Sequence, residues 1–201
     1  MVGLFDPPEP ATVLQVDDRT LVDTIIAGDR EAYRLLVERE STTVFRCCYR
    51  VLGHVEDAED VAQESFVTAF RSLASWRGDG SVRAWLAQIA TRQALRAATR
   101  RSRITSLDGG GTDTALTERI PLAQAPDPSA AVAAADTAAQ VREAVTLLPE
   151  PYRETIALRY FAELSIDEIA QALDRPIGTV KVHVHRGLER LRAQLVEEFV
   201  A

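Results

Sequence analysis

The chain has 201 residues, of which 46% are hydrophobic and 26% charged, and its net charge is −7. These are values of globular proteins, and they exclude a wholly disordered, collagen-like or disulfide-dense chain. No apolar stretch approaches the roughly 20 residues that a membrane span needs. Residues 1–10 have neither the basic nor the apolar segment of a secretory signal. We therefore expect a cytoplasmic protein without membrane insertion.

Apolar residues recur at spacings of three and four, and strand-like alternation is nearly absent. The sequence therefore predicts an all-α fold, with two small helical domains joined by a flexible linker. The predicted N-terminal tail, first domain, linker and second domain are residues 1–20, 21–103, 104–135 and 136–201. The linker is acidic and rich in glycine and proline, a composition typical of loops. We expect it to tether the domains without docking them rigidly.

Each domain is expected to contain four helices. Those of the first domain lie near residues 18–27, 29–51, 55–74 and 81–101. Those of the second lie near 134–147, 150–161, 165–173 and 178–198. Glycines separate the first three helices from one another.

The charges of the first domain are segregated along the chain. Five acids and no lysine or arginine lie between Val51 and Phe70, whereas six arginines and no acid lie between Gly80 and Leu107. A basic run inside an acidic protein indicates a local binding site for a polyanion, which the net charge would conceal.

The helix predicted near 55–74 has an acidic outer face. Its inward face carries Ala58, Val61, Ala62, Ser65, Phe66, Ala69, Phe70 and Leu73. The opposite face carries Asp60, Gln63, Glu64, Val67 and Arg71. Such a face is usually only solvated, but an outward valine among polar residues favours docking of another protein.

The helix predicted near 81–101 has alanines on one face and an aromatic-to-arginine stripe on the other. The stripe is Trp85, Ile89, Arg92, Arg96, Arg100 and Arg103. Arginines beside an aromatic ring suit phosphate contact and base stacking, and Trp76 in the preceding loop would add a second stacking surface. The alternative is that Trp85 and Ile89 belong to the core and the arginines are merely solvated.

The end of the chain predicts a helix-turn-helix. Ser165 and Glu168 form a capping box, residues 174–178 make a tight turn, and Thr179 is placed to cap the next helix. In a helix-turn-helix the second helix enters the major groove. Its outward side chains are Val182, His185, Arg186, Glu189 and Arg190, with Lys181 and His183 on the flanks. The alternative is an ordinary helical hairpin with a solvated face.

No catalytic or metal-binding constellation emerges. The two cysteines, Cys47 and Cys48, are adjacent; they lack zinc-ligand spacing and favour core packing. His183 and His185 lie on different sides of their helix, unlike helical metal pairs. We expect neither an enzyme nor a cofactor.

Sequence motifs that occur in order across both domains resemble the extracytoplasmic-function group of bacterial sigma-70 factors, over about residues 20–198. The first domain carries the opening turn Gly28–Ala32, the stretch Asp57–Phe66 and the stretch Trp85–Ala90. The second carries Leu148–Arg153, Leu164–Ala170 and Gly178–Lys181.

The resemblance implies a promoter-specificity subunit of RNA polymerase, with core polymerase, promoter DNA and an anti-sigma factor as partners. Polymerase would bind Asp57, Asp60, Gln63 and Glu64. The melted −10 element would bind Trp76, Arg77, Trp85, Arg92, Arg96 and Arg100. The double-stranded −35 element would bind Thr179, Lys181, Val182, His183, His185, Arg186 and Arg190.

This chain departs from the family at two stripe positions, because the family usually has Asn in place of Arg92 and often Asp in place of Arg96. It also has Val182-His183 where the family often has Ser-Arg, so its −35 preference is its own. A competing hypothesis is a free-standing helix-turn-helix regulator whose first domain binds a ligand. Run-off transcription with core polymerase separates the two hypotheses.

Overall fold

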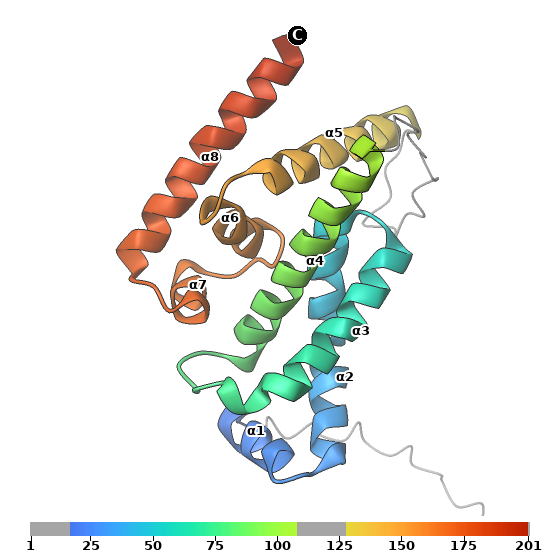
Figure 1. Ribbon diagram of the computed structural model, residues 1–201. Coiled ribbons are helices and arrows are strands. Elements are labelled where there is room, and N and C mark those ends of the chain that lie inside the picture. Colours follow the sequence, from blue (N-terminus) through green and yellow to red (C-terminus); the bar gives the residue numbers. More distant parts are fainter. Residues whose placement is uncertain (1–16, 108–127, 201) are drawn as a thin grey trace, which may run out of the picture.

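A computed structural model describes the backbone of residues 17–107 and 128–200, and the side chains of 17–102 and 134–196. The described chain is all-α, without strands, which confirms the predicted fold class (Figure 1). Its helices are α1 (Asp18–Ile26), α2 (Arg30–Leu52), α3 (Val55–Ser72), a 3₁₀ turn (Leu73–Ser75), α4 (Val82–Leu107), α5 (Pro128–Leu147), α6 (Tyr152–Tyr160), α7 (Ile166–Leu173) and α8 (Ile177–Val200).

The first domain is a bundle in which α2, α3 and α4 pack on one another and α1 closes one end (Figure 1). Asp29 caps α2 by accepting hydrogen bonds from the backbone amides of Glu31 and Ala32. Gly53 ends α2 in the left-handed conformation, with φ of 77°. These local signals set the helix boundaries, and the apolar faces then bury Leu36, Val44, Val61 and Leu86.

The helices flanking the predicted linker are longer than the sequence suggested. Helix α4 continues through Leu107, and α5 already begins at Pro128, so both extend into the segment predicted as linker. Proline suits the first position of a helix, and the alanine-rich run after it has high helix propensity. The middle of the predicted linker, residues 108–127, lies outside the described residues.

The second domain contains the predicted helix-turn-helix. The capping box of Ser165 and Glu168 opens α7 as expected, and Asp174 ends it in the left-handed conformation with φ of 51°. The prediction that Thr179 caps α8 is wrong, because α8 begins at Ile177 and the amide of Val180 already donates to the carbonyl of Pro176. Thr179 therefore lies in the first turn of α8, where it is exposed.

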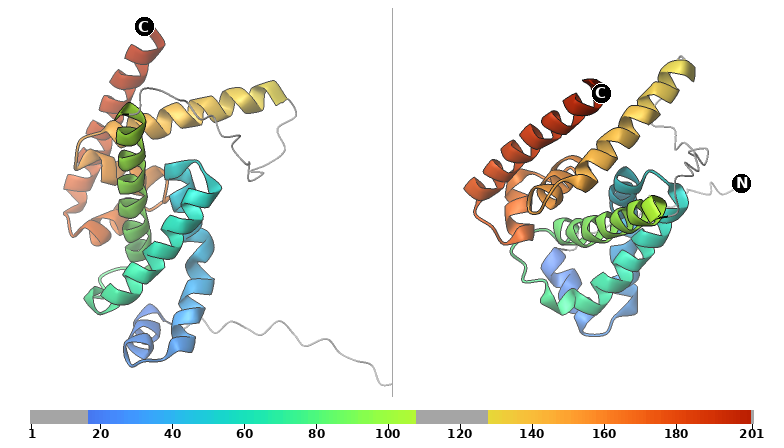
Figure 2. Two further views of the ribbon diagram at one scale, coloured as in Figure 1. Left: turned by 45° about the vertical axis from the view of Figure 1, so that its right-hand side comes forward. Right: turned by 45° about the horizontal axis from the view of Figure 1, so that its top comes forward.

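The two domains are docked, which differs from the expectation of a loose tether. Helix α4 lies between α3 on one side and α6 and α7 on the other (Figures 1 and 2). Ala84 and Ala87 of α4 are at most 2% exposed, and they share a buried cluster with Leu158, Leu164 and Ile169 of the second domain. Small side chains let the helices approach closely, so one alanine-rich helix packs on two partners.

None of the helices in the described part of the chain is both long enough and apolar enough to cross a membrane.

Candidate nucleic-acid and polymerase interfaces

The outer face of α3 is open to solvent. Asp60, Gln63 and Glu64 are exposed, and Val67 is 47% exposed. Asp57 is exposed as well and pairs with Arg101 of α4 at 2.9 Å. This face combines carboxylates with an uncovered aliphatic side chain, which suits a protein partner.

Phe70 departs from the predicted inward face of α3, since it is 53% exposed. Its ring lies edge-on against Tyr33 of α2, with ring centroids 4.8 Å apart, and the hydroxyl of Tyr33 donates to the carbonyl of Phe66. Tyr33 occupies the space under the helix, so Phe70 enlarges the apolar part of the exposed α3 face.

The stripe on α4 is divided between core and surface. Trp85 and Ile89 are half-buried and pack against the main core, as the alternative interpretation proposed. Arg92, Arg96 and Arg100 are exposed on the same side of the helix. Arg92 donates to the carboxylate of Glu154 in α6, whose side chain is only 12% exposed. The stripe arginines therefore border a cleft between the domains and remain exposed to solvent.

Trp76 does not offer the free stacking surface that the sequence suggested. It is 9% exposed and belongs to the core, and the guanidinium of Arg19 lies 5.8 Å from its ring. Arg77 beside it is exposed and pairs with Asp174 at 3.0 Å. A cation–π contact with an arginine of α1 stabilises this loop. The spacing of residues within the loop does not predict that contact.

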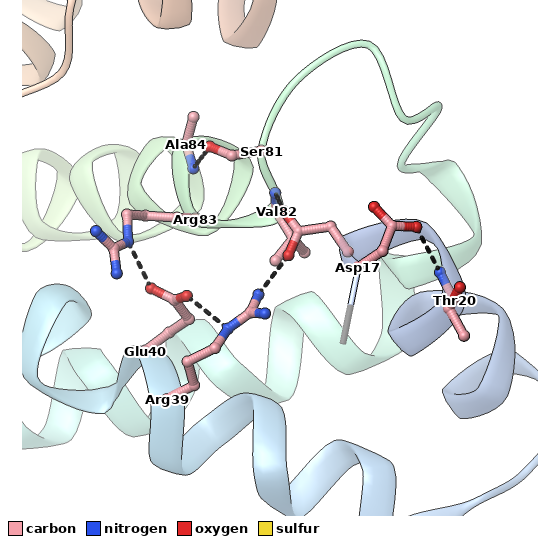
Figure 3. A network of polar contacts seen from close by, with 9 residues as sticks. Asp17, Thr20, Arg39, Glu40, Ser81, Val82, Arg83 and Ala84 are labelled. Carbon is pink, nitrogen blue, oxygen red and sulfur yellow. Dashed lines mark hydrogen bonds and ion pairs between the residues drawn. The ribbon is translucent and has the colours of Figure 1, made fainter. Parts of the chain in front are cut away.

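A buried carboxylate fixes where α4 begins, and sequence reasoning missed it. Glu40 of α2 is 2% exposed and accepts from Arg39 at 2.9 Å and from Arg83 at 3.0 Å (Figure 3). Asp18 of α1 accepts from Arg39 at 2.6 Å and from the backbone amide of Val82 at 2.8 Å. A buried charge needs such partners. The network ties α1, α2 and the start of α4 together, directly after the loop that carries Trp76 and Arg77.

Two cavities lie along the stripe. One of about 350 Å³ is bounded by the loop and by Trp76, Trp85 and Arg92 in the first domain, and by Gln171 and Asp174 in the second. The other, of about 660 Å³, lies between α4 and α6, and its charged lining is Arg92, Arg96, Arg100, Glu150, Arg153 and Glu154. Residues of both domains line each cavity, so the second domain borders the proposed −10 face.

The outward face of α8 is uncovered. Thr179, Lys181, His185 and Arg186 are exposed, and Val182 is 44% exposed. His185 lies 3.4 Å from Glu189 on the same face. The inward side chains Val180, Val184, Leu188, Leu191 and Leu195 all pack on the cores, as predicted.

Two further predicted −35 residues, like His185, have partners inside the domain. His183 is half-buried, 3.3 Å from Arg175 through its Nδ1 and edge-on to Tyr152. Burial, together with the nearby charges of Arg175 and Arg186, lowers the pKa of His183. Arg190 lies 5.0 Å above the Tyr152 ring. His183 therefore lies at the flank of the outward face, as predicted, whereas Arg190 is exposed while it contacts the Tyr152 ring.

The cysteines behave as core residues. Cys47 and Cys48 are at most 1% exposed and unpaired. Burial raises the pKa of Cys47 to about 11, and burial also raises that of Cys48. Thiols in such an environment are poor nucleophiles at neutral pH. Among the residues described by the structure, no group of three metal-ligating side chains gathers.

A helix-turn-helix with an exposed basic helix, joined to a second arginine-bearing face, defines a DNA-binding transcription protein. Two family models match the chain, Sigma-70 region 2 over residues 36–104 and Sigma-70 region 4 over residues 138–191. The ECF RNA polymerase sigma factor SigW of Bacillus subtilis (strain 168) is 34% identical over 170 residues, which cover 84% of this chain and 91% of SigW. The chain belongs to the ECF group of the sigma-70 family.

Two solved structures share the fold. CnrH, in complex with the cytosolic domain of CnrY, has a TM-score of 0.58 and 23% identity over 90% of this chain and 97% of its own. The sigma factor RpoE, in complex with the anti-sigma factor NepR from Bartonella quintana, has a TM-score of 0.52 and 19% identity over 81% and 96%. The family models and the similarity to SigW, rather than these structures, show that the chain is a sigma factor, a class of protein that directs RNA polymerase to promoters and is not enzymatic. A free-standing regulator is not favoured.

Proposed function

We propose that three separate faces divide the work of initiation. The α3 face (Asp57, Asp60, Gln63 and Glu64) binds core polymerase. The −10 face (Trp76, Arg77, Trp85, Arg92, Arg96 and Arg100) holds the melted promoter strand. The α8 face (Thr179, Lys181, Val182, His183, His185, Arg186 and Arg190) reads the −35 element in the major groove.

One observation carries this division: the acidic exposed face and the arginine face lie on neighbouring helices of one bundle. The carboxylates on α3 repel DNA phosphates, whereas the guanidiniums on α4 attract them. Polymerase and promoter strand can therefore occupy adjacent sides of the first domain without competing for the same side chains. The buried network around Glu40 supports the loop and the start of α4 between them.

The −10 face is proposed to act mainly through charge. Arginines supply phosphate attraction, and none of the three stripe arginines offers the paired donor and acceptor with which an amide reads a base edge. Trp85, half-buried at the wall of the smaller cavity, is the aromatic side chain of this face that is positioned to stack on an unpaired base. Trp76 supports the cavity from within the core.

Run-off transcription tests the proposal. The purified chain and bacterial core polymerase are incubated with a fragmented genomic DNA library, and the initiated transcripts are sequenced. Defined start sites that appear only with both proteins support the function, and a shared sequence upstream of them gives the −10 and −35 elements. A chain that binds promoter fragments equally well without polymerase, and starts no transcripts with it, contradicts the proposal.

We further propose that the chain works in the cytoplasm, where polymerase and DNA are found, and that an anti-sigma factor controls it. Support for such a partner comes from the relative RpoE, whose structure contains the anti-sigma factor NepR. Affinity capture of the tagged chain from its own host, followed by mass spectrometry, tests this. Recovery of core polymerase without any such regulator, under conditions in which the chain is inactive, argues against it.

A further inference from the structure

The loop of residues 76–81, which we name the α4 loop, leads into a helix whose first amide is capped from another helix. Ser81 caps α4 locally, because its hydroxyl oxygen accepts from an amide in the first turn at 3.1 Å. The amide of Val82 instead donates to Oδ2 of Asp18 in α1, at 2.8 Å. Oδ1 of the same carboxylate accepts from Arg39 at 2.6 Å. The first amides of a helix have no partner within it, so α1 supplies a cap that the loop itself does not contain.

The other end of the α4 loop contacts the next residue of α1. Nη2 of Arg19 donates to the carbonyl of Arg77 at 3.4 Å, and the guanidinium lies 5.8 Å from the centroid of the Trp76 ring. Gly78 leaves room for this guanidinium, since a Cβ built there would lie 2.9 Å from Cζ of Arg19. Its φ of 79° is also a conformation that favours glycine. Asp18 and Arg19, adjacent in α1, thus contact the two ends of one short loop.

The α4 loop forms part of the proposed −10 face. Arg77 is exposed on it, and the loop lines the cavity of about 350 Å³ together with Trp85 of α4. A binding group selects its ligand sharply only when supporting contacts hold it within about 0.5 Å of the required geometry. The contacts that α1 makes at both ends of the loop are of this supporting kind, and they come from residues distant in sequence.

We propose that Asp18 and Arg19 are positioning residues for base choice at the −10 element. They act through the α4 loop, whose two ends they fix before DNA arrives, so that an unpaired base meets Arg77 and Trp85 in one geometry. A base of another shape then requires the loop to break its contacts with α1, which costs free energy and increases discrimination. This inference rests on the proposed assignment of this face to the −10 strand.

Base selectivity of the holoenzyme tests the proposal. Full-length chain and core polymerase form open complexes on a promoter found by run-off transcription, with each of the four bases at each −10 position. Asp18→Ala removes both accepted hydrogen bonds, and we expect the affinity ratio between the preferred base and the others to fall by about threefold to tenfold at one position. Asp18→Asn keeps an oxygen for the amide of Val82 but loses the charge beside Arg39, so it should lie between wild type and Asp18→Ala. An equal loss of affinity for all four bases shows a merely structural role and overturns the proposal.

Substitutions of Arg19 test the other end of the α4 loop from an exposed position, where loss of the fold is not expected. Arg19→Ala should lower the same ratio by about twofold to fivefold, and Arg19→Lys, which keeps a cation near the Trp76 ring, should lower it less. Asp23→Ala is the matched control for Asp18→Ala, because it removes the same charge from an exposed position of the same helix. A control effect as large as that of Asp18→Ala contradicts a specific role of Asp18.

Hydrogen exchange of the free chain measures the contact with α1 without DNA or polymerase. In Asp18→Ala the amide of Val82 should exchange at least about threefold faster than in wild type, and in Asp23→Ala it should not change. Unchanged exchange in Asp18→Ala overturns the proposal, as does faster exchange with unaltered base selectivity; in both cases the proposed function stands. Wild-type holoenzyme that shows no base preference at any −10 position instead contradicts the proposed function of this face, and the inference with it.

Discussion

The two surfaces that we propose bind DNA, the arginine stripe of α4 and the outward face of α8, differ in what covers them. Helical periodicity directs both away from their own domain cores. On α8 the central side chains Val182 and Arg186 remain exposed. On α4, Arg92 meets a carboxylate from the other domain. A pattern within one helix shows which side leaves its own core, but not whether a neighbouring domain lies there.

The reason lies in how each helix is packed. Helix α8 is at the outside of the molecule, and the second domain packs on one side of it (Figures 1 and 2). Helix α4 is central and presents alanines to both domains, with Ala90 and Ala94 in the larger core and Ala84 and Ala87 in the smaller one. A helix that packs on two sides has little outer surface left, so its polar stripe borders an interdomain cleft.

The largest expected effect concerns the α3 face, which is exposed to solvent. Asp60→Arg with Glu64→Arg should abolish capture of core polymerase and leave the fold intact, because like charges across an interface cost several kcal/mol. Pull-down of core polymerase measures the effect, and circular dichroism checks the fold. Asp136→Arg with Glu143→Arg on α5 makes the same charge change at two other exposed positions and should retain polymerase. Normal capture of core polymerase by the α3 double variant would show that this face does not bind polymerase.

The open face of α8 predicts a difference between two neighbouring side chains. Arg186→Ala should weaken binding to a −35 duplex by about 1–3 kcal/mol, since it loses a guanine or phosphate contact. Val182→Ser should cost less and relax the preference at one position, since it loses an apolar contact that suits a thymine methyl. Selection of −35 duplexes from a randomised pool measures both. An unchanged preference at every position in Val182→Ser would show that no such contact exists.

Close packing of α8 against α6 fixes the orientation of the outward face of α8. Substitutions at two glycines of α8 test how much this packing contributes to stability. A Cβ on Gly187 would lie 2.6 Å from Cγ1 of the buried Ile156, so Gly187→Ala should destabilise the protein by about 1–3 kcal/mol. Gly178 has nothing within 4 Å of its Cβ position, so Gly178→Ala should be neutral or stabilising by up to about 1 kcal/mol. Urea denaturation compares the two. Equal stability of the two variants would contradict the tight contact of α8 with α6.

The smallest expected effect is a difference between Arg92 and Arg96 of the α4 stripe in how their substitution changes base preference. Each phosphate contact adds about 0.7 to the salt slope of single-strand binding, so Arg96→Ala should flatten the salt dependence of open-complex formation by about that amount without altering base preference. Arg92→Asn should flatten it similarly and sharpen the preference at one −10 position, because an amide reads a base edge. Open-complex affinity across a salt series on −10 variants measures both. Equal slopes for wild type and both variants would mean that the stripe faces only protein or solvent.

The sequence by itself determined the parts of this protein that depend on local physics. Caps, glycine turns and three-to-four spacing predict the helices and the helix-turn-helix, and the motifs from Asp57 to Lys181 identify the family. The inward face of α8 and the exposed acids of α3 follow from the same periodicity. These features depend on neighbours only a few residues apart, so the chain displays them directly.

Only the tertiary structure decided what depends on residues distant in sequence. It buried Trp76 with the guanidinium of Arg19 against its ring, placed Glu40 between two arginines, and exposed Phe70 because Tyr33 fills the space below it. It also docked the second domain on α4, pairing Arg92 with a residue 62 positions later. Composition predicts how loosely a linker can hold two domains, but their contact depends on how well two surfaces fit, and that fit exists only after both have folded.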